Sequence, residues 1–366
     1  MFTPQRLTLA RERRGLTKRK LAEKIDVTER SVIGFESGEL PPGVDTLARI
    51  SKELKFPLAF FSAPEAFVPA IETVSFRSLA RMTAQRRNAA IGASAIAIML
   101  NDWIEGQFDL PVVNLPDLRG QEPEAAANAI RQKWGLGQTP IKNMVHLLES
   151  KGVRVYSLAD HSPDADALSF WHDDKPFVCL NTAKSGERGR FDAAHELGHL
   201  ILHRHGGPVG QDAEKEAHAF AAALLMPSSS ILGTVPKWIT TGQLLTEKKR
   251  WQVSAMAFAM RLKNVGLITE WHYAMLCKEL SIKGYRSTEK DGIKREISQL
   301  LAKVFTALSE DNISKAQVAE KLNIDEDELN SHIFGLVITD IRSNPNPTVS
   351  FNRSVRSNFT VLKGGR

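Results

Sequence analysis

The chain has 366 residues, of which 42% are hydrophobic and 25% are charged. This length predicts two or three domains with their own cores, and the composition excludes a disordered, collagen-like or coiled-coil protein. The longest apolar run, from Ala89 to Leu100, is shorter than the roughly 18–20 residues that span a membrane, and residues 1–10 lack the core of a signal peptide. We therefore expect a cytoplasmic protein without a membrane partner.

Charge and cysteine content narrow the class further. The net charge is +6, and positive side chains concentrate between residues 11 and 30, where eight basic residues stand against four acidic ones. Such a concentration favours an anionic partner. The two cysteines, Cys179 and Cys277, are too few for a disulfide framework or a cysteine-rich zinc module.

The basic segment carries a pattern of short helices. Apolar spacing predicts helices over residues 18–25 and 28–35, with Thr28 as the N-cap of the second, and a closing helix over residues 44–54. Only two residues separate the first two helices, so the pair is interpreted as a helix-turn-helix.

The rest of the chain predicts a second folded unit and a helical end. The expected elements are helices over 124–134 and 141–151 and strands over 153–158, 167–172 and 176–180, the last two joined as a hairpin. The fold class is multidomain and mainly α, with an all-α helix-turn-helix domain, an α+β domain with a small antiparallel sheet, and a helical C-terminal region. The expected boundaries are 1–62 for the helix-turn-helix domain, 63–123 for a helical connector and linker, 124–232 for the α+β domain and 233–366 for the C-terminal region.

Two segments of the chain, one near each end, have similar sequences. Residues 17–29 align without gaps to residues 314–326, which predicts a helix-turn-helix-like segment at about 310–335. Its second helix begins with four acidic residues, 325–328, and these would repel phosphates. We therefore expect a packing or dimerising role for this segment.

The histidines point to a metal. Residues 195–199 read His-Glu-Leu-Gly-His, and two histidines four positions apart lie on one face of a helix, where both can reach one ion. Zinc held by three protein groups keeps a fourth position for water and lowers the pKa of that water to near 7. We therefore expect zinc as cofactor, His195 and His199 as ligands and Glu196 as general base.

The third ligand has two placements. His205 lies at the spacing of a longer histidine motif, but that motif needs a glycine where this chain has Leu202. A glutamate from a later helix over residues 214–226 would complete a two-histidine, one-glutamate site. We prefer Glu216, because it lies on the inward, apolar face of that helix. Glu214 is the reserve candidate, and its position better fits an acidic first turn exposed to solvent.

The other histidines have weaker assignments. His203 and His205 are expected to end the helix, where its dipole favours them. His218 is a candidate to orient a ligand, and His172 is a candidate to stabilise an oxyanion. The strand at residues 167–172 offers an edge to which an extended peptide could add.

Two motifs together resemble the ImmA/IrrE family of zinc metallopeptidases. They are F-D-A-A-H-E-L-G-H-L-I-L-H at residues 191–203 and E-K-E-A-H-A-F-A-A-A-L-L-M-P at residues 214–227. The resemblance covers about residues 124–227 and implies a gluzincin-like domain. It implies His195, His199 and Glu216 as zinc ligands and Glu196 as the catalytic residue. His218 departs from the family, which often has Asn or Asp there.

The N-terminal segment looks like the XRE/Cro-type helix-turn-helix family. The resemblance rests on residues 7–54, including L-T at 16–17, L-A at 21–22, V-T at 27–28 and F-E-S-G at 35–38. The residues that it implies for contact with double-stranded DNA are Glu29, Arg30 and Ser31 in the major groove and Lys18 at the phosphates. Gly34 occupies a position that often carries a side chain facing the groove.

These resemblances imply a DNA-binding transcriptional regulator with a zinc endopeptidase domain. ImmA/IrrE-like proteins relieve repression by cutting a repressor, so the expected partner is a repressor or an antitoxin, or the chain's own linker near residues 111–123. We also expect a homodimer. The alternative is a non-enzymatic transcription factor whose metallopeptidase-like domain senses a metal or ligand and controls dimerisation.

Overall fold

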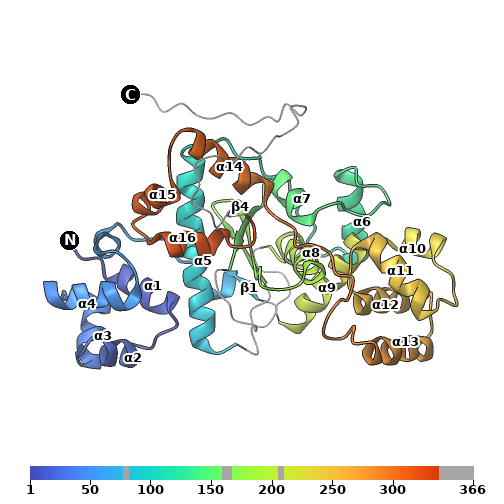
Figure 1. Cartoon of the computed structure of the whole chain (residues 1–366), viewed down its shortest axis with the longest axis horizontal. Helices are drawn as coiled ribbons and strands as arrows, with labels where there is room; N and C mark the ends of the chain where they lie inside the picture. The colour runs from blue at the N-terminus through green and yellow to red at the C-terminus, as the bar shows by residue number, and fades with distance from the viewer. Residues whose placement is uncertain (77–81, 159–166, 205–209, 338–366) are drawn as a thin grey trace. The chain divides into compact units, whose positions relative to one another are not determined.

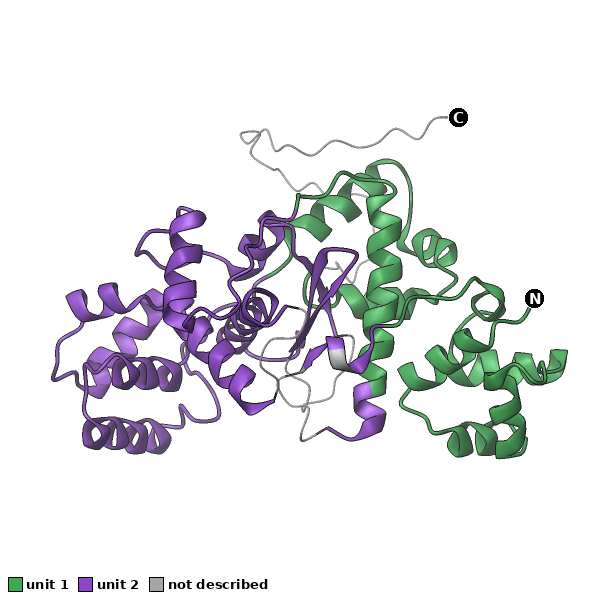
Figure 2. Cartoon of the chain, turned by 180° about the vertical axis from the view of Figure 1, so that it is seen from behind, with its two compact units in different colours: residues 1–68, 88–112, 297–366 green, residues 69–87, 113–296 purple. Residues whose placement is uncertain are grey.

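The computed structural model describes residues 1–76, 82–158, 167–204 and 210–337 (Figure 1). The chain forms two compact units (Figure 2). Unit 1 comprises residues 1–68, 88–112 and 297–366, and unit 2 comprises residues 69–87 and 113–296. This division differs from the expected succession of domains, because the last stretch of the chain falls in the unit that contains the helix-turn-helix.

The N-terminal part of unit 1 confirms the predicted helix-turn-helix. Its helices are α1 (Pro4–Arg13), α2 (Lys18–Lys24), α3 (Glu29–Ser37) and α4 (Val44–Leu54). Thr28 is the N-cap of α3 and accepts a hydrogen bond from the backbone N–H of Ser31. Asp26 turns the chain between α2 and α3 with a φ of 53°, and Leu21 and Val32 pack in a core with no exposed surface.

The C-terminal part of unit 1 contains the predicted second helix pair. Most of the long helix α5 (Ala84–Glu105) also belongs to unit 1. The helices of the C-terminal part are α14 (Gln299–Glu310), α15 (Lys315–Lys321) and α16 (Glu326–Ile333). Asn323 turns the chain before α16 with a φ of 56°, close to the 53° of Asp26 in the first helix pair. The acidic start of α16 packs within unit 1, where the buried Glu328 carboxylate accepts hydrogen bonds from Arg13 Nε at 2.7 Å and Arg14 Nη1 at 2.5 Å. The geometry agrees with the packing role expected for this helix.

Unit 2 is built on a four-stranded sheet. Its strands are β1 (Ser75–Phe76), β2 (Arg154–Ser157), β3 (Ala167–His172) and β4 (Lys175–Leu180), in the order β1-β3-β4-β2. The hairpin between β3 and β4 is confirmed, and its two turn residues, Asp173 and Asp174, have φ values of 46° and 57°. Positive φ at both positions is what a two-residue turn with the right twist requires.

The expectation of an antiparallel sheet is wrong for one pair of strands. β2 runs parallel to β4, so the sheet is mixed. Parallel neighbours cannot be joined by a short turn. The hairpin of β3 and β4 places β4 in the middle of the sheet, and β2 then pairs with its free side.

Helices complete unit 2. They are α6 (Pro123–Lys133), α7 (Met144–Ser150), α8 (Gly186–Leu202), α9 (Gln211–Leu225), α10 (Ser228–Thr234), α11 (Thr241–Trp251), α12 (Ala255–Asn264) and α13 (Glu270–Ile282). Short 3-10 helices, η1 (Leu58–Ser62) and η2 (Ile71–Thr73), lie in unit 1 and unit 2 respectively. Every residue from Arg190 to Leu202 of α8 is buried, because the helix packs against both the sheet and α9.

Candidate metal centre and DNA-binding helix

The two histidines of the His-Glu-Leu-Gly-His sequence lie one turn apart on α8. Ser185 caps the start of this helix by accepting a hydrogen bond from the backbone N–H of Arg188. His195 and His199 are 1% and 6% exposed, and their Nε2 atoms are 3.1 Å apart. Two imidazole nitrogens thus meet at one point in the interior of unit 2.

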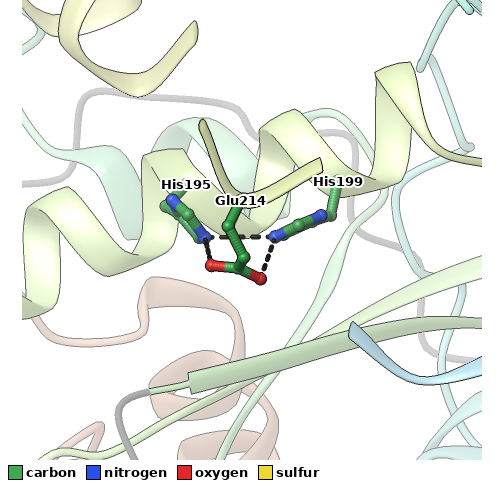
Figure 3. A group of neighbouring side chains, drawn as sticks. All are labelled: His195, His199 and Glu214. Atoms are coloured by element: carbon green, nitrogen blue, oxygen red, sulfur yellow. Dashed lines mark hydrogen bonds and ion pairs between the residues drawn. The ribbon is translucent and has the colours of Figure 1, made fainter. Parts of the chain in front are cut away.

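Glu214 of α9 supplies a carboxylate at the same point (Figure 3). Its Oε2 is 3.3 Å from His195 Nε2, and its Oε1 is 3.3 Å from His199 Nε2. Burial raises the pKa of Glu214, but the hydrogen bonds and charges of the two imidazoles outweigh burial and lower the pKa to about 2. The carboxylate is therefore ionised at neutral pH.

A close approach of α8 and α9 brings these groups together. Gly198 has no side chain, and a Cβ there would lie 3.1 Å from the Cα of Ala217 and 3.1 Å from the ring of Phe220. Glu214 lies three residues before Ala217, which is close to one turn of the helix. The carboxylate therefore reaches the histidines on either side of Gly198.

Glu216, the glutamate preferred from the sequence, has a different neighbour. Its Oε2 is 3.0 Å from Nε2 of His203. At about 100° per residue, Glu216 lies about 100° around α9 from the buried Ala217, whereas Glu214 lies only about 60° away on the other side. This difference explains why Glu214 joins His195 and His199 and Glu216 does not.

His203 connects Glu216 to His199, one of the two histidines of the metal centre. Nδ1 of His203 is 2.9 Å from Nδ1 of His199, and its Nε2 faces Glu216. Desolvation lowers the pKa of His203 despite the nearby carboxylate. A neutral His203 can accept from the Nδ1–H of His199 and donate its own Nε2–H to Glu216, which leaves the Nε2 lone pair of His199 free for a ligand.

Glu196 is fully buried next to β3. The hydroxyl of Ser169, in the middle of β3, donates a hydrogen bond to Oε2 of Glu196 at 2.6 Å. Ser169 was absent from the residues predicted for the site. Its signal in the sequence is weak, since it is only a small polar residue between the apolar Leu168 and Phe170.

The remaining predicted histidines lie farther out. His218 is exposed, and its ring contacts that of Phe191 at 4.8 Å between centroids and faces that of His195 at 6.4 Å. His172 lies at the end of the β3–β4 hairpin, with its Nε2 3.5 Å from a carboxylate oxygen of Asp173. His205 lies outside the described residues.

The three side chains fit a zinc ion on geometry and chemistry. Their ligand atoms all lie within 4.8 Å of one another, and the closest pairs are 3.1–3.3 Å apart. A tetrahedral ion with bonds of about 2.0–2.1 Å separates its ligands by about 3.3 Å. Imidazole nitrogens and a carboxylate oxygen are donors that zinc prefers in catalytic sites.

The residues expected to contact DNA lie at the start of α3 and on α2. Glu29 and Arg30 are exposed, whereas Ser31 is half-buried and its hydroxyl is 2.8 Å from that of Thr28. Lys18 is partly exposed and lies 3.5 Å from the carboxylate of Glu36.

Gly34 does not face outward on α3. It is buried, and a Cβ at this position would lie 3.7 Å from Leu40, an ordinary packing distance. A Cβ would therefore fit at this position, so the packing of the segment after α3 does not depend on the glycine. Its lack of a side chain removes nothing from the exposed start of the helix.

Comparison with protein families identifies both parts. Residues 148–263 match the model of the peptidase M78 family, described as the IrrE N-terminal-like domain, and residues 7–61 match a helix-turn-helix model. The chain joins an N-terminal helix-turn-helix to an IrrE N-terminal-like domain. No curated protein matches the chain. Among the described residues, no helix combines the length and the apolar character that crossing a membrane demands.

The match includes the candidate metal centre. α8, α9 and the strands β2, β3 and β4 all lie within the residues matched to the IrrE N-terminal-like domain. The two-residue strand β1 lies outside this match, although it pairs with β3. The helix-turn-helix domain is a DNA-binding module, and its match begins within α1 and extends past the end of α4.

Proposed function

We propose that this protein is a DNA-binding transcriptional regulator whose IrrE-like domain is a zinc endopeptidase. The observation that carries the proposal is the meeting of His195, His199 and Glu214 around one point, with the buried carboxylate of Glu196 on the same helix. The substrate is a repressor or antitoxin protein, or a second copy of this chain, and its cleavage relieves repression. The protein acts in the cytoplasm as a homodimer.

Each residue of the site has a distinct role in this mechanism. His195, His199 and Glu214 would hold the metal, and the link through His203 to Glu216 favours the tautomer of His199 that leaves Nε2 available for it. Zinc would supply a Lewis acid for the scissile carbonyl and acidify the attacking water. Glu196 accepts the proton of that water on its carboxylate and later delivers it to the leaving amine. Ser169 keeps the Glu196 carboxylate oriented by its hydrogen bond at 2.6 Å.

DNA binding directs this activity to a promoter. The exposed Arg30 at the start of α3 reads base edges, together with Glu29 and Ser31, and Lys18 contacts phosphate. The acidic helix α16 packs in unit 1 through its buried Glu328, and the exposed acidic residues 325–327 would repel phosphates, so we assign it no DNA contact.

Two measurements test the proposal: the zinc content of the purified chain, and the new protein N-termini that proteolysis creates in cells. Elemental analysis of the purified chain is expected to give about one zinc per chain, lost in His199→Ala. Proteome-wide sequencing of new N-termini, in cells expressing wild type or Glu196→Gln, is expected to reveal a cleaved protein only with wild type. Cleavage that persists in Glu196→Gln contradicts the mechanism.

The alternative function, a metal sensor without turnover, predicts a different pattern. Promoter control would then be lost in His195→Ala, which removes a ligand, and remain normal in Glu196→Gln, which keeps all three. A zinc peptidase loses control in both variants. The two functions are thus separated by one reporter measurement.

A further inference from the structure

The sheet of unit 2 has a short strand at one edge. The strand order is β1-β3-β4-β2, and β1 contains only Ser75 and Phe76. These two residues pair antiparallel with Ser169 and Leu168 of β3. Without β1, the backbone of β3 would present its N–H and C=O groups at the edge, where an extended peptide can add as a new strand.

The residue that β1 covers lies at the candidate catalytic carboxylate. Ser169 is the pairing partner of Ser75, and its hydroxyl donates to Glu196 at 2.6 Å. Directly opposite residues of an antiparallel pair have Cα atoms about 4.5–5.5 Å apart and project to the same face of the sheet. The backbone of Ser75 therefore runs beside the residue that orients Glu196, and in Figure 3 the blue strand β1 lies beside the green strands of the sheet.

We propose that, in the resting protein, residues 74–76 of the same chain occupy the edge of β3 at which a peptide substrate would add as a strand. The inference rests on the proposed peptidase function. Val74 strengthens the contact, since it is only 4% exposed and immediately precedes the paired residues. The segment is thus held by backbone pairing and by one buried apolar side chain.

Because β1 occupies the edge of β3, peptides that form more contacts with β3 bind in preference to those that form fewer. A segment tethered in the same chain competes at an effective concentration in the millimolar range, so a peptide at lower concentration displaces it only by making more contacts. The apparent affinity of a peptide is its intrinsic affinity multiplied by the fraction of molecules in which the edge is free. Because only two residues of β1 pair with β3, a protein segment that pairs over a longer stretch of β3 displaces β1 at a lower concentration than a short peptide does.

Two variants separate the edge from the metal. Ser75→Pro with Phe76→Pro removes both backbone N–H groups of β1, so the strand loses its donors to β3. Ser75→Thr with Phe76→Tyr keeps both N–H groups and favours a strand, and is the matched control. The probes are acetohydroxamate, which binds the metal without a peptide backbone, and a Val-Ser-Phe tripeptide ending in a hydroxamate, which copies residues 74–76.

Calorimetric titration of the zinc-loaded full chain with both probes tests the proposal. We expect the tripeptide hydroxamate to bind the proline variant about tenfold or more tightly than wild type, with no gain in the control, and acetohydroxamate to bind all three equally. Equal tripeptide affinity in all three proteins overturns the proposal. Failure of wild type to bind zinc or acetohydroxamate refutes instead the peptidase function on which it rests.

Hydrogen exchange on the wild-type chain gives a second measurement that needs no variant. Saturation with the tripeptide hydroxamate is expected to raise the amide exchange of residues 74–76, whereas acetohydroxamate leaves it unchanged. Unchanged exchange with both probes overturns the proposal. Cleavage of the wild-type chain within residues 74–76 also overturns it, because the segment would then be a substrate and not an occupant.

Discussion

Two glutamates two residues apart on α9 have different expected effects on zinc binding. Glu214→Gln removes the carboxylate that lies 3.3 Å from both His195 and His199. Glu216→Gln removes the carboxylate 3.0 Å from His203, and His203 in turn contacts His199. Both changes keep side-chain volume and the helix, so they compare the two carboxylates at nearly constant structure.

The expected magnitudes follow from what each carboxylate contacts. Structural zinc sites bind with about 10–16 kcal/mol in all, so one of three or four ligands contributes about 3–5 kcal/mol, or about 10²–10⁴-fold in affinity. Loss of Glu214 is expected to cost this much. Groups that orient a ligand are worth about 10–100-fold, or about 1.4–2.8 kcal/mol, and this is the range expected for Glu216.

The assay is competition for zinc against a chromophoric chelator at neutral pH, with thermal unfolding of the metal-free proteins as a control for folding. The expected order of affinity is wild type, then Glu216→Gln, then Glu214→Gln. A larger loss in Glu216→Gln than in Glu214→Gln would refute the geometric assignment and restore the preference drawn from the sequence.

Three further predictions concern packing, DNA and pH. Gly198→Ala adds a methyl group 3.1 Å from the backbone of α9. It is expected to lower the free energy of unfolding by about 1–3 kcal/mol and to weaken zinc binding, measured by urea denaturation and chelator competition. Arg30→Ala is expected to weaken operator binding by about 1–3 kcal/mol and relax its specificity, whereas Lys18→Ala mainly lowers the salt dependence in gel shifts. Desolvation, opposed by Glu328, lowers the pKa of buried His332, so stability from its neutral form is present above about pH 6.5 and is lost as pH falls. The urea midpoint of wild type should therefore drop more between pH 7.5 and 5.5 than that of His332→Gln, and equal drops would contradict this reasoning.

Features set by neighbours in the chain could be predicted from the sequence. The helix-turn-helix depends on apolar spacing and on the cap at Thr28, and both are local. The turn at Asp173 and Asp174 is likewise local, since two residues that tolerate positive φ lie between alternating apolar runs. The shared face of His195 and His199 follows from the helical period alone.

Features set by distant contacts could not be predicted in the same way. The choice between Glu214 and Glu216 depends on how α9 rotates against α8, which is governed by the close contact at Gly198. The pairing of β1 with β3 involves two residues that are more than ninety positions from their partners, and so short a strand leaves no periodic signal. The packing of α16 in unit 1 depends on Glu328 meeting Arg13, again far away in the chain.

The burial of the site argues that α8 is kept for chemistry and not for stability. His195, Glu196 and His199 are all at most 6% exposed, and buried ionisable groups are stable only when they are paired. Their partners are themselves polar. Ser169 donates to Glu196, and a separate set of polar contacts runs from His195 through His199 and His203 to Glu216. Well-packed apolar residues of similar volume often stabilise a core as much or more. A helix selected for stability alone would therefore carry apolar side chains on this face, and the polar residues that it carries instead are the ones that can hold a metal and move a proton.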